Sequence, residues 1–369
     1  MLGAGAKSLT ATSEVGMLNK PKILTLYNQK FGGVRYYRQL MPSRHLPFNF
    51  THDTSLLEAK EEDVEELVVS LVKNHDLIFI KHFDNPSLIV ALLGACSYYN
   101  KPLVVDFDDN IFTSDGLAPD KYTYSEESEK LHYIETLLKE CTAITVSVPS
   151  LIPIYDKYAP VSLLPNMVDI EDWKLQKRNH ERITVGWSGS VSHLKDHAVL
   201  LDVYDEVIRK TPDVVFSFMG QTTPEQIKGV PRKNWEIKPA TDSWERYPRL
   251  LAEAGYDIGL APLIQSKFNE SRSLAKWFEY TMVGIPLIAS EVGPYKQLRD
   301  GKDAFLVQTK QGWVEAIDYL IKNKNDRDKL VATAKQRIAD EFTTDKLIPT
   351  WNEVFQSLIG TGFTRKHKS

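Results

Sequence analysis

Residues 268–284 carry three charged side chains at helical spacing: Arg272, Lys276 and Glu279. Positions three and four apart share one face of a helix, so these side chains are predicted to lie together. An apolar stripe on the opposite face is expected to meet the core; it comprises Leu274, Trp277, Phe278 and Thr281. The two cations suit a phosphate group, and Glu279 can accept hydrogen bonds from sugar or ribose hydroxyls. A solvated helix with one ion pair is the alternative.

Two polar residues, Asn269 and Ser271, precede these charges at the expected beginning of the helix. The free N–H groups of a helix N-terminus attract anions. We therefore expect Asn269, Ser271 and Arg272 to contact a phosphate.

A second candidate lies at residues 186–190, where a strand-like run ends in small residues. Such residues let a diphosphate approach the backbone; they include Ser188, Gly189 and Ser190. Lys195 follows at the start of a helical stretch and suits the same anion. His193 and His197 stand four apart, which fits two ligands of one metal. No third ligand is indicated by the spacing, so we expect no metal site, and phosphate-contacting or solvent-facing histidines are the alternative.

The first half of the chain offers weaker signals. Gly32 and Gly33 follow the first strand-like run and open a helix, with Arg35 and Arg38 as nearby cations. This pattern permits close approach of an anion, although a tight turn alone explains a Gly-Gly pair equally well. His82 follows another strand, where a substrate contact and a structural role are both open.

Three aspartates end a further strand: Asp106, Asp108 and Asp109. Carboxylates at this spacing can hold Mg²⁺ or Mn²⁺ against a diphosphate. Aspartates are also common in loops that need no metal. Both interpretations are open from the sequence.

The elements that must position these residues alternate between strand and helix. Apolar runs near residues 22–28, 76–83, 102–109 and 143–148 are predicted strands, with helical patterns between them. A polar break at 166–182 precedes a second alternation with six strand-like runs. Continuous apolar strands between amphipathic helices indicate parallel sheets. We predict an α/β protein with two Rossmann-like, doubly wound domains, whose ligand lies in the cleft between them.

The predicted divisions follow from this pattern. Residues 1–20 are expected to be a disordered leader, 21–165 the first domain, 166–182 the linker and 183–341 the second domain. Residues 342–360 form a final helix and 361–369 a basic tail.

Composition agrees with a two-domain protein of ordinary solubility. At about 150 residues per domain, 369 residues allow two domains. The formal net charge of −4 excludes a chain built as a whole to coat nucleic acid or an anionic membrane. Two cysteines form no disulfide framework, which favours a reducing compartment. No apolar run is long enough to span a bilayer, and we expect a cytoplasmic protein.

The order of motifs resembles the GT-B-fold glycosyltransferases, in particular the large retaining group called family 4. The second domain carries most of the resemblance, in VGWSGS…HLKD, FSFMG, YPRLLAEAGYDIGLAPL and SRSLAKWFEYTMVGIPLIAS. NQKFGGVRYYR, VVDFDDNIF, AITVSVPSLIPIY and LLPNMVDIEDW in the first domain also fit, so that the resemblance spans about residues 22–310. In this fold the last helix commonly crosses back onto the first domain.

The resemblance implies a nucleoside-diphosphate sugar donor, UDP-linked donors included, bound mainly by the second domain. It places Gly33 at the donor phosphates and makes Lys195 the phosphate-binding lysine. His82 corresponds to a histidine that contacts the donor sugar. Glu279 matches the second glutamate of the Glu-x7-Glu motif, which holds the ribose. Phe218–Gly220 and Pro239–Ala240 would lie near the nucleobase.

Two positions depart from the family pattern. Ser271 stands where the first glutamate of the motif is usual, and Ser190 replaces an arginine five residues before Lys195. Arg272 or Lys276 is expected to supply the missing positive charge.

The candidate catalytic residues are therefore Lys195, Arg272 and His82. The expected reaction is glycosyl transfer to an acceptor hydroxyl, with retention and without a cofactor or a divalent metal. An inverting route would need a carboxylate base, for which Asp108 or Asp109 is the candidate.

Rival interpretations are a metal-dependent GT-A enzyme, a nucleotide-sugar epimerase and a catalytically silent, partner-binding subunit. The acceptor stays open among a glycan, a lipid-linked sugar, a protein and modified DNA; Tyr36 and Tyr37 either stack on it or pack in the core.

Overall fold

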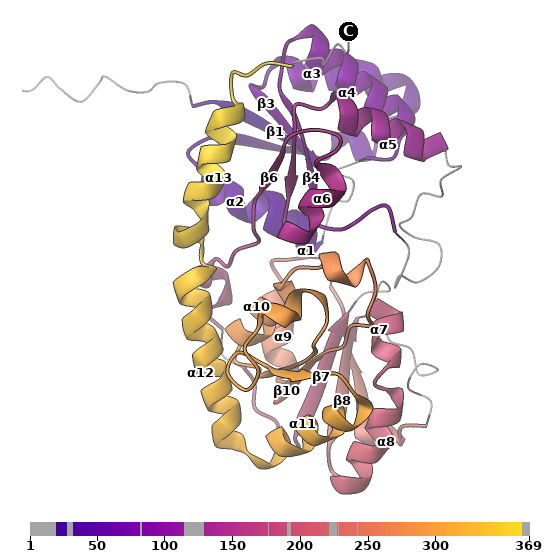
Figure 1. Ribbon diagram of the computed structural model, residues 1–369, viewed down its shortest axis with the longest axis vertical. Coiled ribbons are helices and arrows are strands. Elements are labelled where there is room, and N and C mark those ends of the chain that lie inside the picture. Colours follow the sequence, from indigo (N-terminus) through magenta and orange to yellow (C-terminus); the bar gives the residue numbers. More distant parts are fainter. Residues whose placement is uncertain are drawn as a thin grey trace, which may run out of the picture.

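The computed structural model describes residues 20–27, 32–81, 83–113, 129–175, 177–189, 193–220, 227, 229–241 and 243–363. The predicted leader and most of the basic tail lie outside these residues. Within them, the strands form two parallel six-stranded sheets, each covered by helices (Figure 1). None of the described helices combines the length and apolar character needed to span a membrane.

The first sheet has the strand order β2-β1-β3-β4-β5-β6. Its strands are β1 (Lys22–Leu26), β2 (Asn49–Asp53), β3 (Leu77–Lys81), β4 (Leu103–Phe107), β5 (Ala143–Val146) and β6 (Val161–Leu163). The four predicted strands are the inner ones, which are almost fully buried and correspondingly apolar. The edge strands β2 and β6 are not predicted by the apolar pattern, and their residues are mostly half-buried. An edge strand has one solvated side, so its sequence lacks the continuous apolar run of a central strand.

The helices of this domain pack on both sides of the sheet. They are α1 (Gly33–Arg35), α2 (Met41–His45), α3 (Val64–Lys73), α4 (Pro86–Tyr98), α5 (Glu129–Glu140) and α6 (Ile152–Tyr155). A wide π-helical turn at Tyr36–Leu40 joins α1 to α2 and buries Tyr36, Tyr37 and Arg38. The Asn85 side chain caps α4 by accepting a hydrogen bond from the Leu88 amide over 3.0 Å.

The second sheet has the strand order β12-β11-β10-β7-β8-β9, the doubly wound Rossmann order. All six predicted strands are present: β7 (Thr184–Gly189), β8 (Val215–Gly220), β9 (Trp235–Lys238), β10 (Ile258–Ala261), β11 (Leu287–Ser290) and β12 (Phe305–Val307). The α/β class and the doubly wound, two-domain architecture predicted from the sequence are confirmed.

The helices of the second domain correct several predicted boundaries. They are α7 (Leu194–Ala198), α8 (Leu201–Lys210), α9 (Tyr247–Ala254), α10 (Ala275–Met282), α11 (Lys310–Lys322) and α12 (Lys324–Glu341). The helical stretch predicted to begin near Lys195 is two helices, α7 and α8. The helix expected to begin near Asn269 and Ser271 begins at Ala275, because Asn269–Ser271 form a separate 3-10 turn and Arg272 is extended.

The chain passes between the domains twice at one place. Val168, on the way to the second domain, pairs in parallel with Thr343, on the way back. The Val168 amide donates to the Phe342 carbonyl over 2.8 Å, and the Thr344 amide donates to the Val168 carbonyl over 3.0 Å. The two crossings are therefore tied together.

The last helix, α13 (Thr344–Leu358), runs along the first domain beside α2 (Figure 1). Its Phe355 ring packs against Phe48 and Phe79 of the first domain. Trp351 is fully buried, and its indole N–H donates to the Pro165 carbonyl over 3.1 Å. The end of the described chain thus completes the core of the first domain.

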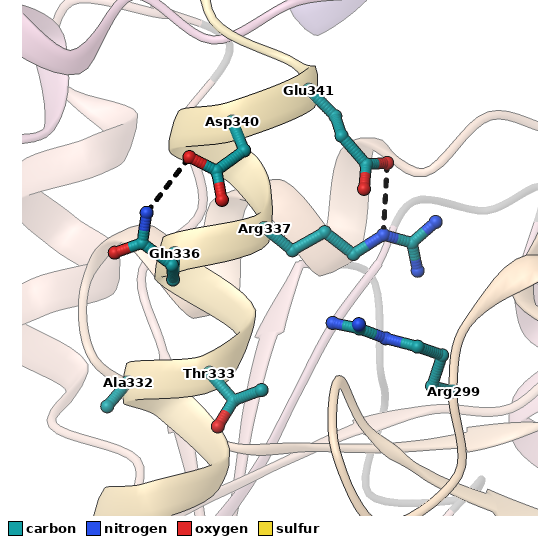
Figure 2. Close-up of a pocket in the computed structure, with 7 residues that line it drawn as sticks. All are labelled: Arg299, Ala332, Thr333, Gln336, Arg337, Asp340 and Glu341. Carbon is teal, nitrogen blue, oxygen red and sulfur yellow. Dashed lines mark hydrogen bonds and ion pairs between the residues drawn. The ribbon is translucent and has the colours of Figure 1, made fainter.

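A shallow hollow of about 470 Å³ lies along α12 (Figure 2). In it Arg337 reaches Glu341 and Gln336 reaches Asp340. Arg337 also donates to the fully buried Asp303 over 2.6 Å. Because Arg299 and Arg337 both pair with Asp303, the contacts in this hollow hold α12 against the rest of the second domain directly before the chain crosses back.

Candidate active site

A cavity of about 840 Å³ lies between the carboxyl ends of the two sheets. Residues at or just beyond the ends of β1, β4, β7, β8, β9 and β10 supply most of its walls. Strand order reverses between β1 and β3 and between β7 and β10, and ligands of doubly wound sheets bind at such points. The lining residues of the first domain and linker are Gly32, Gly33, Val34, Tyr37, Arg38, Asp108, Asp109 and Asn166.

Most of the predicted donor-binding residues meet in this cavity. Those that line it are Gly32, Gly33, Ser188, Gly189, Gly220, Arg272, Lys276 and Glu279. Asn269, Ser271 and Lys195 are not among the lining residues. His82 and Ser190 lie outside the described residues, so their predicted roles stay predictions.

Glycines at the ends of β7 and β8 form a backbone floor. Gly189 and Gly220 are neighbours across the two strands. Gly220 has φ +115°, and a Cβ there would lie 1.9 Å from the Gly189 carbonyl oxygen. Only glycine satisfies both conditions, so the floor stays open to a ligand.

Arg272 reaches from the second domain to the first. Its Nη1 donates to Asp109 Oδ1 over 3.2 Å, and its Nη2 lies 2.6 Å from His193 Nε2. The guanidinium also lies over the Phe268 ring, 5.2 Å from its centre. Burial lowers the pKa of Arg272, but the carboxylates of Asp109 and Asp108 outweigh burial and raise it above its ordinary value. Arg272 is therefore a fixed positive charge in the cavity wall.

Lys276 is the second cation, and it lies in the first turn of α10, four residues after Arg272. Its ammonium donates to the Ser188 carbonyl at the end of β7. Burial lowers the pKa of Lys276, and the positive charge of Arg272 adds to this effect. Two cations held close together in a partly buried wall favour a ligand of opposite charge.

Glu279 lies on the same helix and is only 8% exposed. Its carboxylate accepts a hydrogen bond from the Tyr247 hydroxyl over 2.9 Å and a longer one from the Tyr37 hydroxyl over 3.5 Å. Burial raises the pKa of Glu279 above its ordinary value. The grouping of Arg272, Lys276 and Glu279 on one wall agrees with the sequence prediction, and so does the burial of the apolar stripe.

Asn269 and Ser271 do not lie at the helix N-terminus where the sequence spacing places them, and their phosphate contacts stay predictions. Both side chains are buried in the 3-10 turn. The Asn269 amide donates to Asp196 Oδ1 over 2.8 Å, and the Ser271 hydroxyl donates to the Lys267 carbonyl over 3.4 Å. Because α10 begins at Ala275, neither residue stands at its N-terminus.

Lys195, predicted as the phosphate-binding lysine, is exposed on α7. In the described structure the cavity cations are instead Arg272 and Lys276, together with Arg38 and Arg246 at its edges. Lys195 thus stays a prediction without a contact to this cavity.

The structure also shows the partners of the charged residues of the first domain. Arg38 is 1% exposed and forms a two-pronged ion pair with Asp106, at 3.0 Å and 2.7 Å. Asp106 is therefore engaged with Arg38 in the core, whereas Asp108 pairs with Lys81. Among the described residues, no three His, Cys, Asp or Glu side chains gather around a possible metal position.

Aromatic residues that join the domains carried little signal in the sequence. Trp244 lines the cavity and stacks on Tyr36 with 4.0 Å between ring centres. Tyr36 and Tyr37 are 4% and 3% exposed, which supports core packing over stacking on an acceptor. The spacing of aromatic residues along the sequence does not predict that Tyr36 of the first domain stacks on Trp244 of the second.

Comparison with known proteins bears on this architecture. Residues 204–352 match a family model described as glycosyl transferase-like. Trehalose synthases of Thermococcus litoralis and Pyrococcus horikoshii are 26% and 25% identical over 170 and 173 residues, which is 43% and 44% of this chain. The matched segment spans 40% of the length of each relative.

Solved structures resemble nearly the whole chain. A glycosyltransferase from Rickettsia africae has a TM-score of 0.65 at 13% identity, covering 93% of this chain and 100% of its own. Anabaena HepE in complex with UDP and glucose has a TM-score of 0.65 at 15% identity, covering 91% and 100%. Sucrose-phosphate synthase from Thermosynechococcus elongatus has a TM-score of 0.62 at 13% identity, covering 91% and 99%.

The fold is therefore that of the two-domain GT-B glycosyltransferases, as the sequence motifs predict. Within it, the part that follows the first helices of the second domain matches the glycosyl transferase-like family model.

Proposed function

We propose that this protein transfers a glycosyl group from a nucleoside-diphosphate sugar to an acceptor hydroxyl. The observation that carries the proposal is the cavity wall on which Arg272, Lys276 and Glu279 stand together above the glycine floor of β7 and β8. Cations beside a closely approachable backbone suit a diphosphate, and a buried carboxylate suits a ribose diol. Uridine diphosphate is the favoured leaving group, since UDP occupies the structurally similar Anabaena protein.

The chemistry assigned to the wall is stabilisation of the leaving diphosphate. As the bond between the anomeric carbon and the diphosphate oxygen breaks, negative charge grows on that oxygen. Arg272 and Lys276 would offset this charge from fixed positions, and a preorganised donor of this kind is worth about 3–4 kcal/mol. They supply positive charge from the protein itself, so we propose that no divalent metal is required.

We further propose that the configuration of the sugar is retained. The acceptor oxygen bonds to the anomeric carbon on the face that the diphosphate leaves. Its proton passes to the departing phosphate oxygen, so charge and atoms balance without a protein nucleophile. The alternative, an inverting reaction, would use Asp109 as base.

The test is a screen of UDP-, GDP- and ADP-sugars for binding by calorimetry and for consumption with candidate acceptors in excess chelator. We expect UDP release for one donor, and a fall of at least 100-fold in kcat for Arg272→Ala. Anomer analysis by NMR separates retention from inversion. Conversion of the donor alone to another nucleotide-sugar would instead identify an epimerase, and absence of any nucleotide binding would identify a silent subunit.

A further inference from the structure

Three polar side chains, Asp196, His193 and Arg272, form a continuous series of hydrogen bonds. Asp196 Oδ2 lies 3.0 Å from His193 Nδ1, and His193 Nε2 lies 2.6 Å from Arg272 Nη2. His193 lines the cavity and is 13% exposed, whereas Asp196 is 1% exposed. This hydrogen-bonded series therefore extends from the interior of the second domain to the cavity wall.

The partners fix the proton on His193. Arginine carries only donors, so His193 Nε2 must be an acceptor towards Arg272. The single proton of the neutral ring is then on Nδ1, where it is donated to Asp196. Burial and the charge of Arg272 lower the pKa of His193 to about 4, which keeps the ring neutral at physiological pH.

Asp196 is itself anchored. Its Oδ1 accepts hydrogen bonds from the Ile264 amide over 2.9 Å and from the Asn269 side chain over 2.8 Å. Asn269 is 1% exposed and also donates to the Ile264 carbonyl over 2.9 Å. The loop after β10 thus holds Asp196, and Asp196 holds the imidazole.

We propose that His193 is a positioning residue that orients Arg272 towards the donor diphosphate through its Nε2 acceptor. This inference rests on the proposed function. An arginine side chain has several rotatable bonds, and their entropy must be lost before the transition state if the charge is to be preorganised.

A neutral acceptor suits this task better than a carboxylate. A second carboxylate in direct hydrogen-bond contact would add to the negative charge of Asp109, which already pairs with Arg272 on the other side. The imidazole fixes the same guanidinium without placing a second negative charge against it, because the negative charge of Asp196 is one ring further away. Lys276 is the other charged group that acts on His193, and it also disfavours protonation of the ring.

The test compares two substitutions that each keep one half of the imidazole. His193→Gln places an acceptor oxygen near the Nε2 position, and His193→Asn places a donor nitrogen near the Nδ1 position. We expect His193→Gln to keep kcat within about threefold. His193→Asn is expected to lower kcat about 10- to 100-fold, with a smaller change in the KM of the donor.

The same substitutions in an Arg272→Ala background provide the control. If His193 acts through Arg272, His193→Asn has no further effect there. An unchanged kcat for His193→Asn, or an equal loss in both backgrounds, overturns the inference. Thermal melting of each variant separates a loss of folding from a loss of orientation. An inactive wild-type protein that binds no nucleotide would overturn the proposed function itself, and this inference with it.

Discussion

Arg272 and Asp109 face each other from different domains, and the guanidinium donates to the carboxylate over 3.2 Å across the cavity. Both residues line the space assigned to the donor. The positive charge that the chemistry needs is therefore paired with a carboxylate of the other domain. A diphosphate that binds Arg272 must compete with Asp109, so donor binding and the contact between the domains are linked.

Removing the competing charge should strengthen donor binding. We expect Asp109→Asn to lower the Kd of UDP about three- to tenfold, because the amide leaves Arg272 free for the diphosphate. Calorimetry without acceptor isolates this effect from any role of Asp109 in transfer. Asp156→Asn is the matched control, since Asp156 is an exposed acid of the same domain. Weaker UDP binding by Asp109→Asn would contradict the competition.

Glu279 should make donor affinity depend on pH. The ionised carboxylate can accept two hydrogen bonds from a ribose diol, and burial raises its pKa. UDP affinity should therefore fall as the pH is lowered, starting at a higher pH than for an exposed glutamate. Glu279→Gln should weaken UDP binding about tenfold at pH 8 and remove this dependence. UDP without ribose hydroxyls should bind both proteins equally; a tenfold difference with that ligand would argue against the diol assignment.

The same shift has the opposite consequence for stability. A carboxyl group whose pKa is raised by folding stabilises the protein fully below its unfolded pKa, and this contribution is lost as the pH rises through the folded pKa. At neutral pH the buried charge of Glu279 thus costs stability. We expect Glu279→Gln to unfold at the same or a higher urea concentration than the wild type at pH 8; a lower midpoint would show that the hydrogen bonds from Tyr247 and Tyr37 outweigh the cost of burial.

The glycine floor can be tested by a pair of matched substitutions. Gly220 and Gly229 both have positive φ, +115° and +106°, but a Cβ at Gly229 would meet no atom of the described residues within 4 Å. Gly229→Ala therefore measures backbone strain alone, about 1–2 kcal/mol. Gly220→Ala adds the clash with the Gly189 carbonyl and should destabilise the protein by several kcal/mol more. Equal unfolding midpoints for the two variants would disprove the close approach of β7 and β8.

The last helix should contribute to the stability of the first domain. Trp351 is fully buried and lies under Arg38, with 4.8 Å between the guanidinium carbon and the ring centre. Trp351→Ala should cost about 3–5 kcal/mol in the free energy of unfolding. Gln356→Ala, on the exposed side of the same helix, should change it by less than about 0.5 kcal/mol. Chemical unfolding followed by circular dichroism compares the two; similar midpoints would place α13 outside the cooperative core.

Periodicity predicted the second domain strand by strand, because its inner strands are apolar and its helices have one polar face. The same signal failed for β2 and β6, since their edge positions leave half-exposed, polar residues. Sequence spacing also brought Arg272, Lys276 and Glu279 together, although only Lys276 and Glu279 lie on α10 and Arg272 precedes that helix in extended backbone.

Contacts between distant segments had no such signal. Asp109 and Arg272 are 163 residues apart in the sequence, and nothing near either residue predicts that the two side chains meet. Asn269 was expected at a phosphate because it was placed at a helix N-terminus. In the structure a 3-10 turn precedes the helix, which begins at Ala275, and the Asn269 side chain points inward to Asp196. His193 contacts Arg272, which lies in the segment between β10 and α10 and comes near His193 only in the tertiary fold.

The path of α13 has a consequence for biosynthesis. Domains generally fold as units in the order in which they leave the ribosome. Here the first sheet is made early, but Trp351 and Phe355, which close its core, are among the last described residues to be added. The core of the first domain is therefore incomplete, with part of its apolar surface uncovered, until the second domain and then α13 have been translated. A nascent chain halted after Glu341 should expose that surface to chaperones, whereas one extended past Leu358 should not.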